Sequence, residues 1–387
     1  MRLISSQRLV PGTVVARDVR PGIAGTAPLV HAGTRLTPKM CLRLCELDVA
    51  AVWVDDELGE GIEPLEALSE ETRDEAEREV TSTLAQARDA LAGGQQLASI
   101  DVMRLRDVAA AIAQEVSGLP EAVIALSEMR SADAYTHEHS VRVTTLGLLL
   151  AARHWKRNGW IDHRGERRHD NITQRMTQLG FGLLVHDIGK LAIPREVLDR
   201  PGKLDADEWD LVRQHPELGA GMLNHTTTSM LAISVVRYHH ERWDGGGYPR
   251  GLDGASISEL ARIAAVADVY DAVRSERPYK PAQPSHVGVD VVLEGSGTAF
   301  DPKIVETFKE VVMPYPAGHE IDLPDGRRGV VVAVDPTRPY SPRVRIAELE
   351  RADGDDRSGN VDGGGTGVLT EVEIDLSQPP ASVSGGG

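Results

Sequence analysis

The residues best suited to chemistry lie in one stretch, 181–194, where an apolar run, interpreted as the end of a buried helix, delivers His186 and Asp187. Lys190 follows Asp187 by three residues, nearly one helical turn, so these two side chains should share a face. A neutral imidazole and a carboxylate are metal ligands, and the second carboxylate oxygen allows one group to bridge two ions. The ammonium of Lys190 is placed to meet an anion bound there. The stretch therefore predicts a metal site whose remaining ligands must come from elsewhere.

Further potential ligands recur along the same region of the chain. Five imidazoles and two carboxylates fall within it: His139, His186, Asp187, His215, His239, His240 and Asp268. Taken singly, such a histidine is usually a hydrogen-bonded core or surface residue, and a buried aspartate often caps a neighbouring helix. Asp268 and Asp271, however, lie inside an apolar helix, where a carboxylate is costly unless it is paired or metal-bound. The ordered set predicts a metal centre with nitrogen and oxygen ligands, which suit iron, manganese, cobalt or nickel, with zinc as an alternative.

The elements that must position these ligands are predicted to be helices. From about 119 to 312, Leu, Ile, Val and Ala recur with helical periodicity over a length that suits one all-α domain. Residues 153–175 interrupt the pattern, because they are rich in Arg and His and hold few apolar side chains. We interpret them as an exposed basic insertion or extended loop, which either helps to attract an anion or is merely solvated.

Residues 1–62 are predicted to form a small α+β regulatory or interaction module. Short strand-like runs occur in it at 14–16, 28–31 and 51–54. Thr37 suits the N-cap and Pro38 the first position of a helix that runs through Leu47. Its ligand is not indicated by the sequence.

The other flanking segments extend the prediction to a multidomain, mainly α protein. Residues 63–117 should be a helical connector, with helices at 69–91 and 101–116 that either link domains or pair in a homodimer. The central domain is placed at 118–315. A small β module is expected at 316–378, followed by a disordered tail at 379–387. Strands are predicted within that β module at 329–334, 343–346 and 371–375.

Composition limits the classes of function that fit. The 387 residues are 41% hydrophobic, which is enough for real cores, and carry a net charge of −17. This charge argues against broad binding to nucleic acid polymers or anionic membranes. Cys41 and Cys45 are the only cysteines, and small buried thiols in a reducing cytosol are the favoured interpretation. The sequence lacks a signal-peptide core and a run long enough to span a bilayer, so a soluble cytoplasmic protein is expected.

The stretch from about 124 to 279, roughly two-fifths of the chain, resembles the HD-GYP family, a branch of the HD metal-dependent phosphohydrolases. The segments that carry the resemblance are Asp-Ala-Tyr-Thr-His-Glu-His-Ser-Val-Arg-Val at 133–143, His-Asp-Ile-Gly-Lys at 186–190, Pro-Gly-Lys-Leu at 201–204, His-Pro at 215–216, His-His-Glu-Arg-Trp-Asp-Gly-Gly-Gly-Tyr-Pro at 239–249 and Arg-Pro-Tyr-Lys at 277–280. The His-Asp pair alone indicates only the superfamily. Gly247-Tyr248-Pro249 with its upstream His-His-Glu narrows the resemblance to the branch.

The resemblance implies an HD-type helical bundle that hydrolyses cyclic di-GMP, a bacterial second messenger, to linear pGpG, with GMP as a further product left open. Two divalent ions are implied, with iron or manganese favoured over cobalt, nickel or zinc. One ion would be held by His139, His186, Asp187 and Asp268. The other would be held by His215, His239 and His240, with Asp187 bridging. A hydroxide between the ions would attack phosphorus in line with the leaving ribose oxygen.

Substrate contacts are implied by the same resemblance. Lys190 would neutralise charge on the phosphate, which makes it and Asp187 the residues expected to act in catalysis. Tyr248 would stack on guanine or contact a phosphate, while Arg277 and Lys280 would bind phosphate or a guanine edge. Asp271 is expected to orient a ligand or Lys190 rather than to bind metal. Ordinary surface charges on a loop are the alternative for each contact.

One departure and two alternatives accompany this prediction. Some family members have a Glu four residues before the first helix histidine that helps to bind a third ion, whereas this chain has Tyr135 there. Two ions are therefore expected, which puts efficient cleavage of pGpG in doubt. A first alternative is a non-catalytic adaptor that binds nucleotide or a diguanylate cyclase. A second is another HD phosphohydrolase, acting on a dNTP or on (p)ppGpp.

Overall fold

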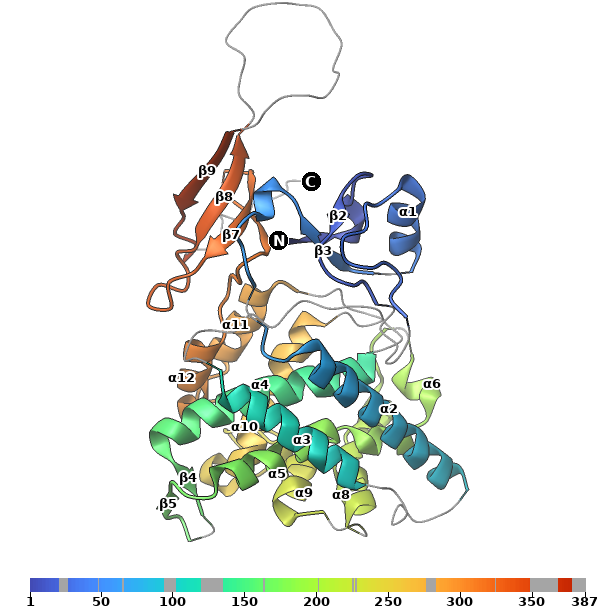
Figure 1. Ribbon diagram of the computed structural model, residues 1–387. Helices are drawn as coiled ribbons and strands as arrows, with labels where there is room; N and C mark the ends of the chain where they lie inside the picture. Colours follow the sequence, from blue (N-terminus) through green and yellow to red (C-terminus); the bar gives the residue numbers. More distant parts are fainter. Residues whose placement is uncertain are drawn as a thin grey trace, which may run out of the picture. The chain divides into compact units, whose positions relative to one another are not determined.

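The computed structural model shows a mainly helical protein with small antiparallel sheets near both ends of the chain, which confirms the expected fold class (Figure 1). It describes residues 1–20, 27–47, 49–64, 66–93, 102–119, 135–162, 164–200, 202–224, 226, 228–275, 283–323, 325–348 and 368–377. Contacts divide the chain into two compact units. Unit 1 comprises Met1–Val19, Pro28–Leu65 and Pro314–Gly387, and unit 2 comprises Arg20–Ala27 and Glu66–Met313. The predicted domain boundaries themselves stay a prediction.

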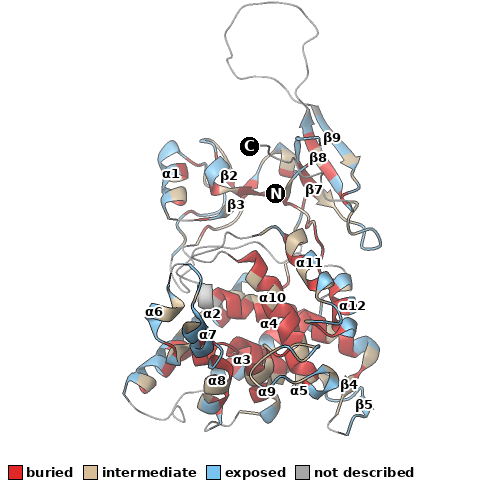
Figure 2. Cartoon of the chain, turned by 180° about the vertical axis from the view of Figure 1, so that it is seen from behind, coloured by how far each residue is buried: buried red, intermediate tan, exposed pale blue. Residues whose placement is uncertain are grey.

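Unit 2 is built from helices that share one apolar core. They are α2 (Glu70–Ala92), α3 (Val102–Ser117), α4 (Tyr135–Asn158), α5 (Ile172–Leu184), α6 (Arg195–Leu198), α7 (Ala206–Val212), α8 (His215–Leu223), α9 (Met230–Tyr238), α10 (Glu259–Arg274), α11 (Ser285–Glu294) and α12 (Pro302–Val311). Buried residues concentrate on the facing sides of α3, α4 and α10 (Figure 2). Trp155, Tyr270 and Phe308 are fully buried, so these three aromatic side chains fill the interior between α4, α10 and α12.

Helices α2 and α3, predicted as a connector, pack against the rest of unit 2. Ser69 caps α2 by accepting a hydrogen bond from the backbone of Thr72, and Gly93 follows its last residue, as the sequence indicates. Leu105 and Ile112 of α3 are completely buried against the core shared with α4 and α5. Each such side chain contributes about 1.5–3 kcal/mol by leaving water. Their apolar faces are thus occupied within the unit, and a homodimer through these helices stays a prediction.

Of the two alternatives predicted for 153–175, the extended loop is wrong for most of the segment, whereas residues 164–171 are exposed, as expected for an exposed basic insertion. Helix α4 continues to Asn158, and strands β4 (Trp160–Ile161) and β5 (Arg167–Arg168) form a short hairpin before α5 begins. The Arg175 guanidinium carbon lies 3.9 Å from the centroid of the Trp160 ring, so this cation packs on an aromatic face. The aliphatic part of an arginine side chain contributes packing that a count of apolar residues does not include.

Unit 1 joins segments from opposite ends of the sequence. Its strands are β1 (Arg2–Ser5), β2 (Val14–Val15), β3 (Ala51–Asp55), β6 (Glu320–Asp322), β7 (Arg328–Ala333), β8 (Arg343–Glu348) and β9 (Val368–Glu373). The first three form a sheet in the order β1-β3-β2, and the last four a sheet in the order β6-β7-β8-β9. Residues 28–31 contribute only an isolated bridge between Val30 and Val19, so the strand expected there is wrong.

Side-chain contacts hold the two ends of the chain together within unit 1. The Arg345 guanidinium donates to the carbonyls of Leu58 and Glu60 at 3.0 and 2.7 Å, and it also pairs with Glu371. Helix α1 (Pro38–Glu46) begins as predicted, with Thr37 accepting from the Met40 backbone. Cys41 and Cys45 on this helix are both free thiols. In the described part of the chain, every helix is too short or too polar to cross a bilayer.

Candidate metal centre

Each potential ligand of unit 2 lies on a helix or directly beside a helix end. His139 projects from α4 and Asp268 from α10. Helix α5 ends at Leu184, so His186 and Asp187 lie just beyond it rather than in its last turn, and Lys190 lies in the 3-10 helix η5 (Ile188–Ala192) that follows. From this position beyond the helix end, Asp187 Oδ2 lies 3.9 Å from Nε2 of His139 on α4, and Nε2 of His186 lies 3.9 Å from Oδ1 of Asp268 on α10.

The remaining imidazoles come from two further helix ends. His215 is the first residue of α8, and His239 and His240 follow the last residue of α9. The structure therefore brings together residues that are up to 129 positions apart in the sequence, from His139 to Asp268.

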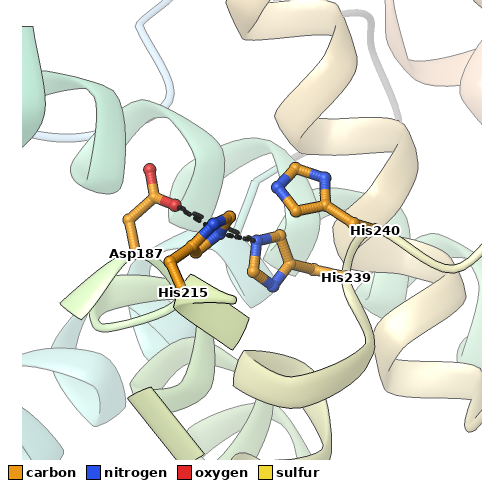
Figure 3. Close-up of side chains that lie close together, drawn as sticks. All are labelled: Asp187, His215, His239 and His240. Atoms are coloured by element: carbon orange, nitrogen blue, oxygen red, sulfur yellow. Dashed lines mark hydrogen bonds and ion pairs between the residues drawn. The ribbon is translucent and has the colours of Figure 1, made fainter. Parts of the chain in front are cut away.

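The donor atoms gather in two groups, within each of which they all lie within 4.8 Å of one another. The first group consists of His139, His186 and Asp268, and all three are buried. In it, Nε2 of His139 lies 3.2 Å from Oδ1 of Asp268, and Nε2 of His186 lies 3.9 Å from the same oxygen. The second group consists of Asp187, His215, His239 and His240 (Figure 3). Each group offers at least three donors to one ion.

Asp187 lies between the two groups, with one oxygen directed towards each. Its Oδ1 lies 3.3 Å from Nε2 of His215 and 3.9 Å from Nε2 of His239. Its Oδ2 lies 3.5 Å from Nε2 of His186 and 2.5 Å from the ammonium nitrogen of Lys190. A carboxylate placed in this way has the geometry to bridge two cations, and Lys190 stands on the same face, as the spacing predicted.

Three imidazoles are held by backbone carbonyls on their outer side. Nδ1 lies 2.7 Å from the Leu183 carbonyl in His186, 2.7 Å from the Val212 carbonyl in His215 and 2.9 Å from the Val236 carbonyl in His239. A carbonyl only accepts, so Nδ1 must carry the proton and Nε2 of each neutral ring presents a lone pair to the centre. This fixed tautomer is the one that a metal ion requires.

His139 is held by a side chain instead of a carbonyl. Its Nδ1 lies 2.7 Å from Oδ2 of Asp271, which accepts further hydrogen bonds from Arg142 and Ser275. Burial lowers the pKa of His139, but its contacts with Asp268 and Asp271 outweigh burial and raise the pKa to about 9. The two carboxylates therefore favour positive charge at this position. Arg142 was not among the predicted site residues, although its place about one helical turn after His139 puts it on the same face of α4.

Burial and charge set the protonation of the other groups. Burial lowers the pKa of His186, and it lowers the pKa of His240 to about 3. Burial alone would raise the pKa of Asp187, but nearby Lys190 and His186 bring it well below its usual value. At neutral pH the centre therefore presents neutral His186 and His240 and an ionised Asp187, which is the state that binds metal, whereas His139 must release a proton when an ion binds.

Two buried atoms in this centre test whether a metal ion fits. Nε2 of His186 and Oδ1 of Asp187 are shielded from solvent and have no hydrogen-bond partner. An unpartnered buried lone pair is costly, and a protein retains it where a ligand completes the site. Both atoms belong to donor groups that offer three or four ligand atoms. These residues therefore fit the metal ions that the resemblance to the HD-GYP family implies.

Two glycines allow η5 to approach α8 closely enough to form the second group. A Cβ built on Gly189 would lie 1.9 Å from the His215 carbonyl oxygen and 2.6 Å from the Gly219 nitrogen. Gly219 in turn faces the Gly189 nitrogen at 3.1 Å from its own ideal Cβ. Larger residues at either position would push Asp187 away from His215.

The loop after His240 folds back over the centre. A Cβ on Gly247 would lie 2.3 Å from the Arg242 nitrogen, so this position requires glycine. Buried Glu241 accepts hydrogen bonds from the Arg250 and Leu252 backbone nitrogens at 2.7 and 3.0 Å. The loop thereby brings the Tyr248 ring onto His240, with ring centroids 4.8 Å apart and an interplanar angle of 29°.

Three predicted residues have positions that the structure does not describe in full. Arg277 and Lys280 lie outside the described residues. Tyr135 is the first residue of α4, but its side chain is not among those that the structure describes. The predicted contacts of Arg277 and Lys280 with substrate therefore stay predictions.

Comparisons with known proteins identify relatives of this chain. Residues 166–304 match the family model described as the HD domain. A cyclic di-GMP phosphodiesterase of Pseudomonas aeruginosa is 37% identical over 284 residues, which cover 72% of this chain and 64% of that protein. One of Thermotoga maritima with the same activity in its name is 37% identical over 169 residues, 42% of this chain and 46% of the relative. A 3′3′-cGAMP-specific phosphodiesterase of Vibrio cholerae is 40% identical over 128 residues, 33% and 24% of the two chains. The chain thus spans less than two thirds of the length of each of these relatives.

Proposed function

Because this chain belongs to the HD domain family, in its HD-GYP branch, we propose that it hydrolyses cyclic di-GMP to linear pGpG with the help of two divalent metal ions. The observation that carries the proposal is the position of Asp187, whose two oxygens each approach a separate set of imidazoles. Relatives named as cyclic di-GMP phosphodiesterases support the choice of substrate.

The proposed ligand sets follow the two groups of donors. His139, His186, Asp187 and Asp268 would hold one ion, and Asp187, His215, His239 and His240 the other. Bound divalent ions supply Lewis-acid chemistry, which acidifies water and neutralises charge on a phosphoryl oxygen. Nitrogen and oxygen donors without thiolate favour iron or manganese, with cobalt, nickel or zinc as alternatives.

The chain's own residues would bind and orient the phosphodiester. Lys190 keeps 34% of its side chain exposed although its ammonium contacts Asp187, so it can meet a phosphate oxygen without leaving its place. The backbone-held imidazoles and the Asp271 contact to His139 would keep the donors fixed as charge develops, which is how a preorganised site lowers a barrier. Tyr248, Arg277 and Lys280 would contact the nucleotide.

Hydrolysis assays with identified products test this proposal. Protein purified without oxygen and loaded with manganese or iron should convert cyclic di-GMP to pGpG, whereas the double variant His186→Ala, Asp187→Ala should not. Equal rates for the two proteins would overturn the proposal. Accumulation of pGpG with little GMP is expected from the Tyr135 departure.

A second candidate substrate is 3′3′-cGAMP, because one relative is named for it. The assay should therefore compare cyclic di-GMP, 3′3′-cGAMP, a dNTP and ppGpp at equal concentration. Preference for either cyclic dinucleotide supports the phosphodiesterase class, and preference for a mononucleotide supports a different HD phosphohydrolase. A protein that binds a nucleotide but never hydrolyses it would be an adaptor.

Binding to diguanylate cyclase partners and a cytoplasmic location stay predictions.

A further inference from the structure

A cation and an exposed aromatic ring continue outward from the metal centre. The Tyr248 ring stacks on His240, and the guanidinium carbon of Arg213 lies 5.6 Å from the Tyr248 ring centroid. The same guanidinium carbon lies 5.8 Å from the Trp209 ring centroid. His240, Tyr248, Arg213 and Trp209 thus form a series that leads from a potential ligand to the surface. We name Trp209 and Arg213 the outer pair.

The outer pair is unusual in what it leaves exposed. Trp209 is 44% exposed, although its indole is a large apolar surface on the short helix α7. Arg213 is exposed and forms no ion pair with any described residue. Nearby arginines differ, because Arg200 pairs with Glu208, and Arg237 pairs with Glu217. Arg213 therefore keeps its hydrogen-bonding groups available, while its guanidinium carbon lies 5.8 and 5.6 Å from the ring centroids of Trp209 and Tyr248.

An indole face beside a guanidinium is the combination that recognises a guanine base. Stacking on an aromatic ring holds any base, and the fork of an arginine matches the O6 and N7 acceptors of guanine. The Tyr248 ring already has one face covered by His240. A base that reaches past Tyr248 from a phosphodiester at the metal centre would next meet the outer pair.

We propose that Trp209 and Arg213 form a subsite for one guanine base of the cyclic dinucleotide. The base stacks on the Trp209 indole, and the Arg213 guanidinium donates to its O6 and N7 atoms. This inference rests on the proposed function. It adds two substrate-binding residues that lie outside the sequence segments that carry the family resemblance. In an acidic chain, it also provides a local positive charge for the substrate.

Binding and kinetics on the full chain test the subsite. Trp209→Ala and Arg213→Ala should each raise KM for cyclic di-GMP about tenfold or more, the scale of one stacked base. Leu211→Ala is the matched control, since Leu211 lies on the same helix and is 37% exposed. Intrinsic fluorescence should be quenched when the manganese-loaded protein binds a phosphorothioate analogue of cyclic di-GMP, and Trp209→Phe should lose most of this quench. Arg213→Ala should also narrow the preference for the analogue over cyclic di-AMP.

The possible results separate this inference from the proposed function. Turnover by the wild-type protein together with wild-type KM values in both alanine variants would overturn the subsite alone. A wild-type protein that hydrolyses no guanine-containing cyclic dinucleotide, and whose fluorescence does not respond to the analogue, would overturn both. Larger KM values in the two variants, with the Leu211→Ala variant unchanged, support the subsite.

Discussion

His139 and Asp271 share a 2.7 Å hydrogen bond that joins α4 to α10. Arg142 reaches the same carboxylate from α4, so Asp271 accepts from two residues of one helix while belonging to another. The imidazole is thus fixed by an ionised partner rather than by a backbone carbonyl, unlike His186, His215 and His239. A carboxylate behind a ligand raises the basicity of the ring, which strengthens its bond to a metal ion.

Replacement of Asp271 should therefore weaken metal binding without removing a direct ligand. We expect Asp271→Asn to lower metal affinity about 10- to 100-fold, because the amide supplies no charge behind His139. Competition with a coloured chelator measures the affinity. Asp107→Asn, an exposed change on α3, is the control. Wild-type affinity in Asp271→Asn would show that the hydrogen bond only packs the two helices.

Removal of the central carboxylate should change the metal content more than removal of Asp268. Asp187 offers one oxygen to each group of donors, whereas Asp268 belongs to one group. Elemental analysis of anaerobically purified protein should find both ions depleted in Asp187→Ala and one ion retained in Asp268→Ala. Identical metal content in the two variants would contradict a bridging position.

Loss of the Lys190 charge should slow the reaction and spare metal binding. Its ammonium lies 2.5 Å from Asp187 and remains partly exposed towards the space where an anion would bind. We expect Lys190→Met to lower kcat about 100-fold, because the loss of one hydrogen-bond donor to the charge that develops in a transition state has an effect of this size. Metal content serves as the control measurement. An unchanged kcat with normal metal content would assign Lys190 to structure only.

A methyl group at position 189 should destabilise the fold of unit 2. The Cβ of Gly189→Ala would lie 1.9 Å from the backbone oxygen of His215, so η5 or α8 must move. Overpacking of this kind costs about 1–3 kcal/mol, measured by urea unfolding of the metal-free protein. Gly221→Ala on α8 is the control, because nothing lies within 4 Å of its Cβ. Equal stability of the two variants would refute the close approach.

Acid should weaken the protein through Glu259, away from the metal centre. Burial would raise the pKa of this carboxyl, but hydrogen bonds from His154 and Trp155 bring the pKa below its usual value, and Arg262 acts in the same direction. Arg175 of α5 is also within electrostatic reach of it. A lowered folded pKa means that the stabilisation is present above the unfolded pKa of about 4.3 and is lost as pH falls through the folded value.

The measurement is the urea midpoint of the metal-free protein between pH 6 and pH 3. The wild-type midpoint should fall more steeply with acid than that of Glu259→Gln, whose side chain does not titrate. Glu166→Gln, an exposed change in the hairpin, is the control. Parallel curves for wild type and Glu259→Gln would remove Glu259 as a source of acid sensitivity.

Residue patterns predicted the helices more reliably than the geometry between them. The Ser69 cap and the Thr37-Pro38 start are local signals, and the structure confirms both helices. Convergence of His139, His215 and Asp268 depends on packing between distant helices, so the spacing of residues could nominate these groups but could not measure their separation. Arg142 and Arg213 were missed because a surface arginine has no distinctive pattern until a partner is placed beside it.

The chain enters unit 2 from unit 1 near residue 65 and returns to unit 1 near residue 314. Most of unit 2 is therefore an insertion into a module assembled from both ends of the chain, and because Arg20–Ala27 also belongs to unit 2, the chain passes between the two units four times. Truncation of the chain at either terminus would remove β-strands from unit 1.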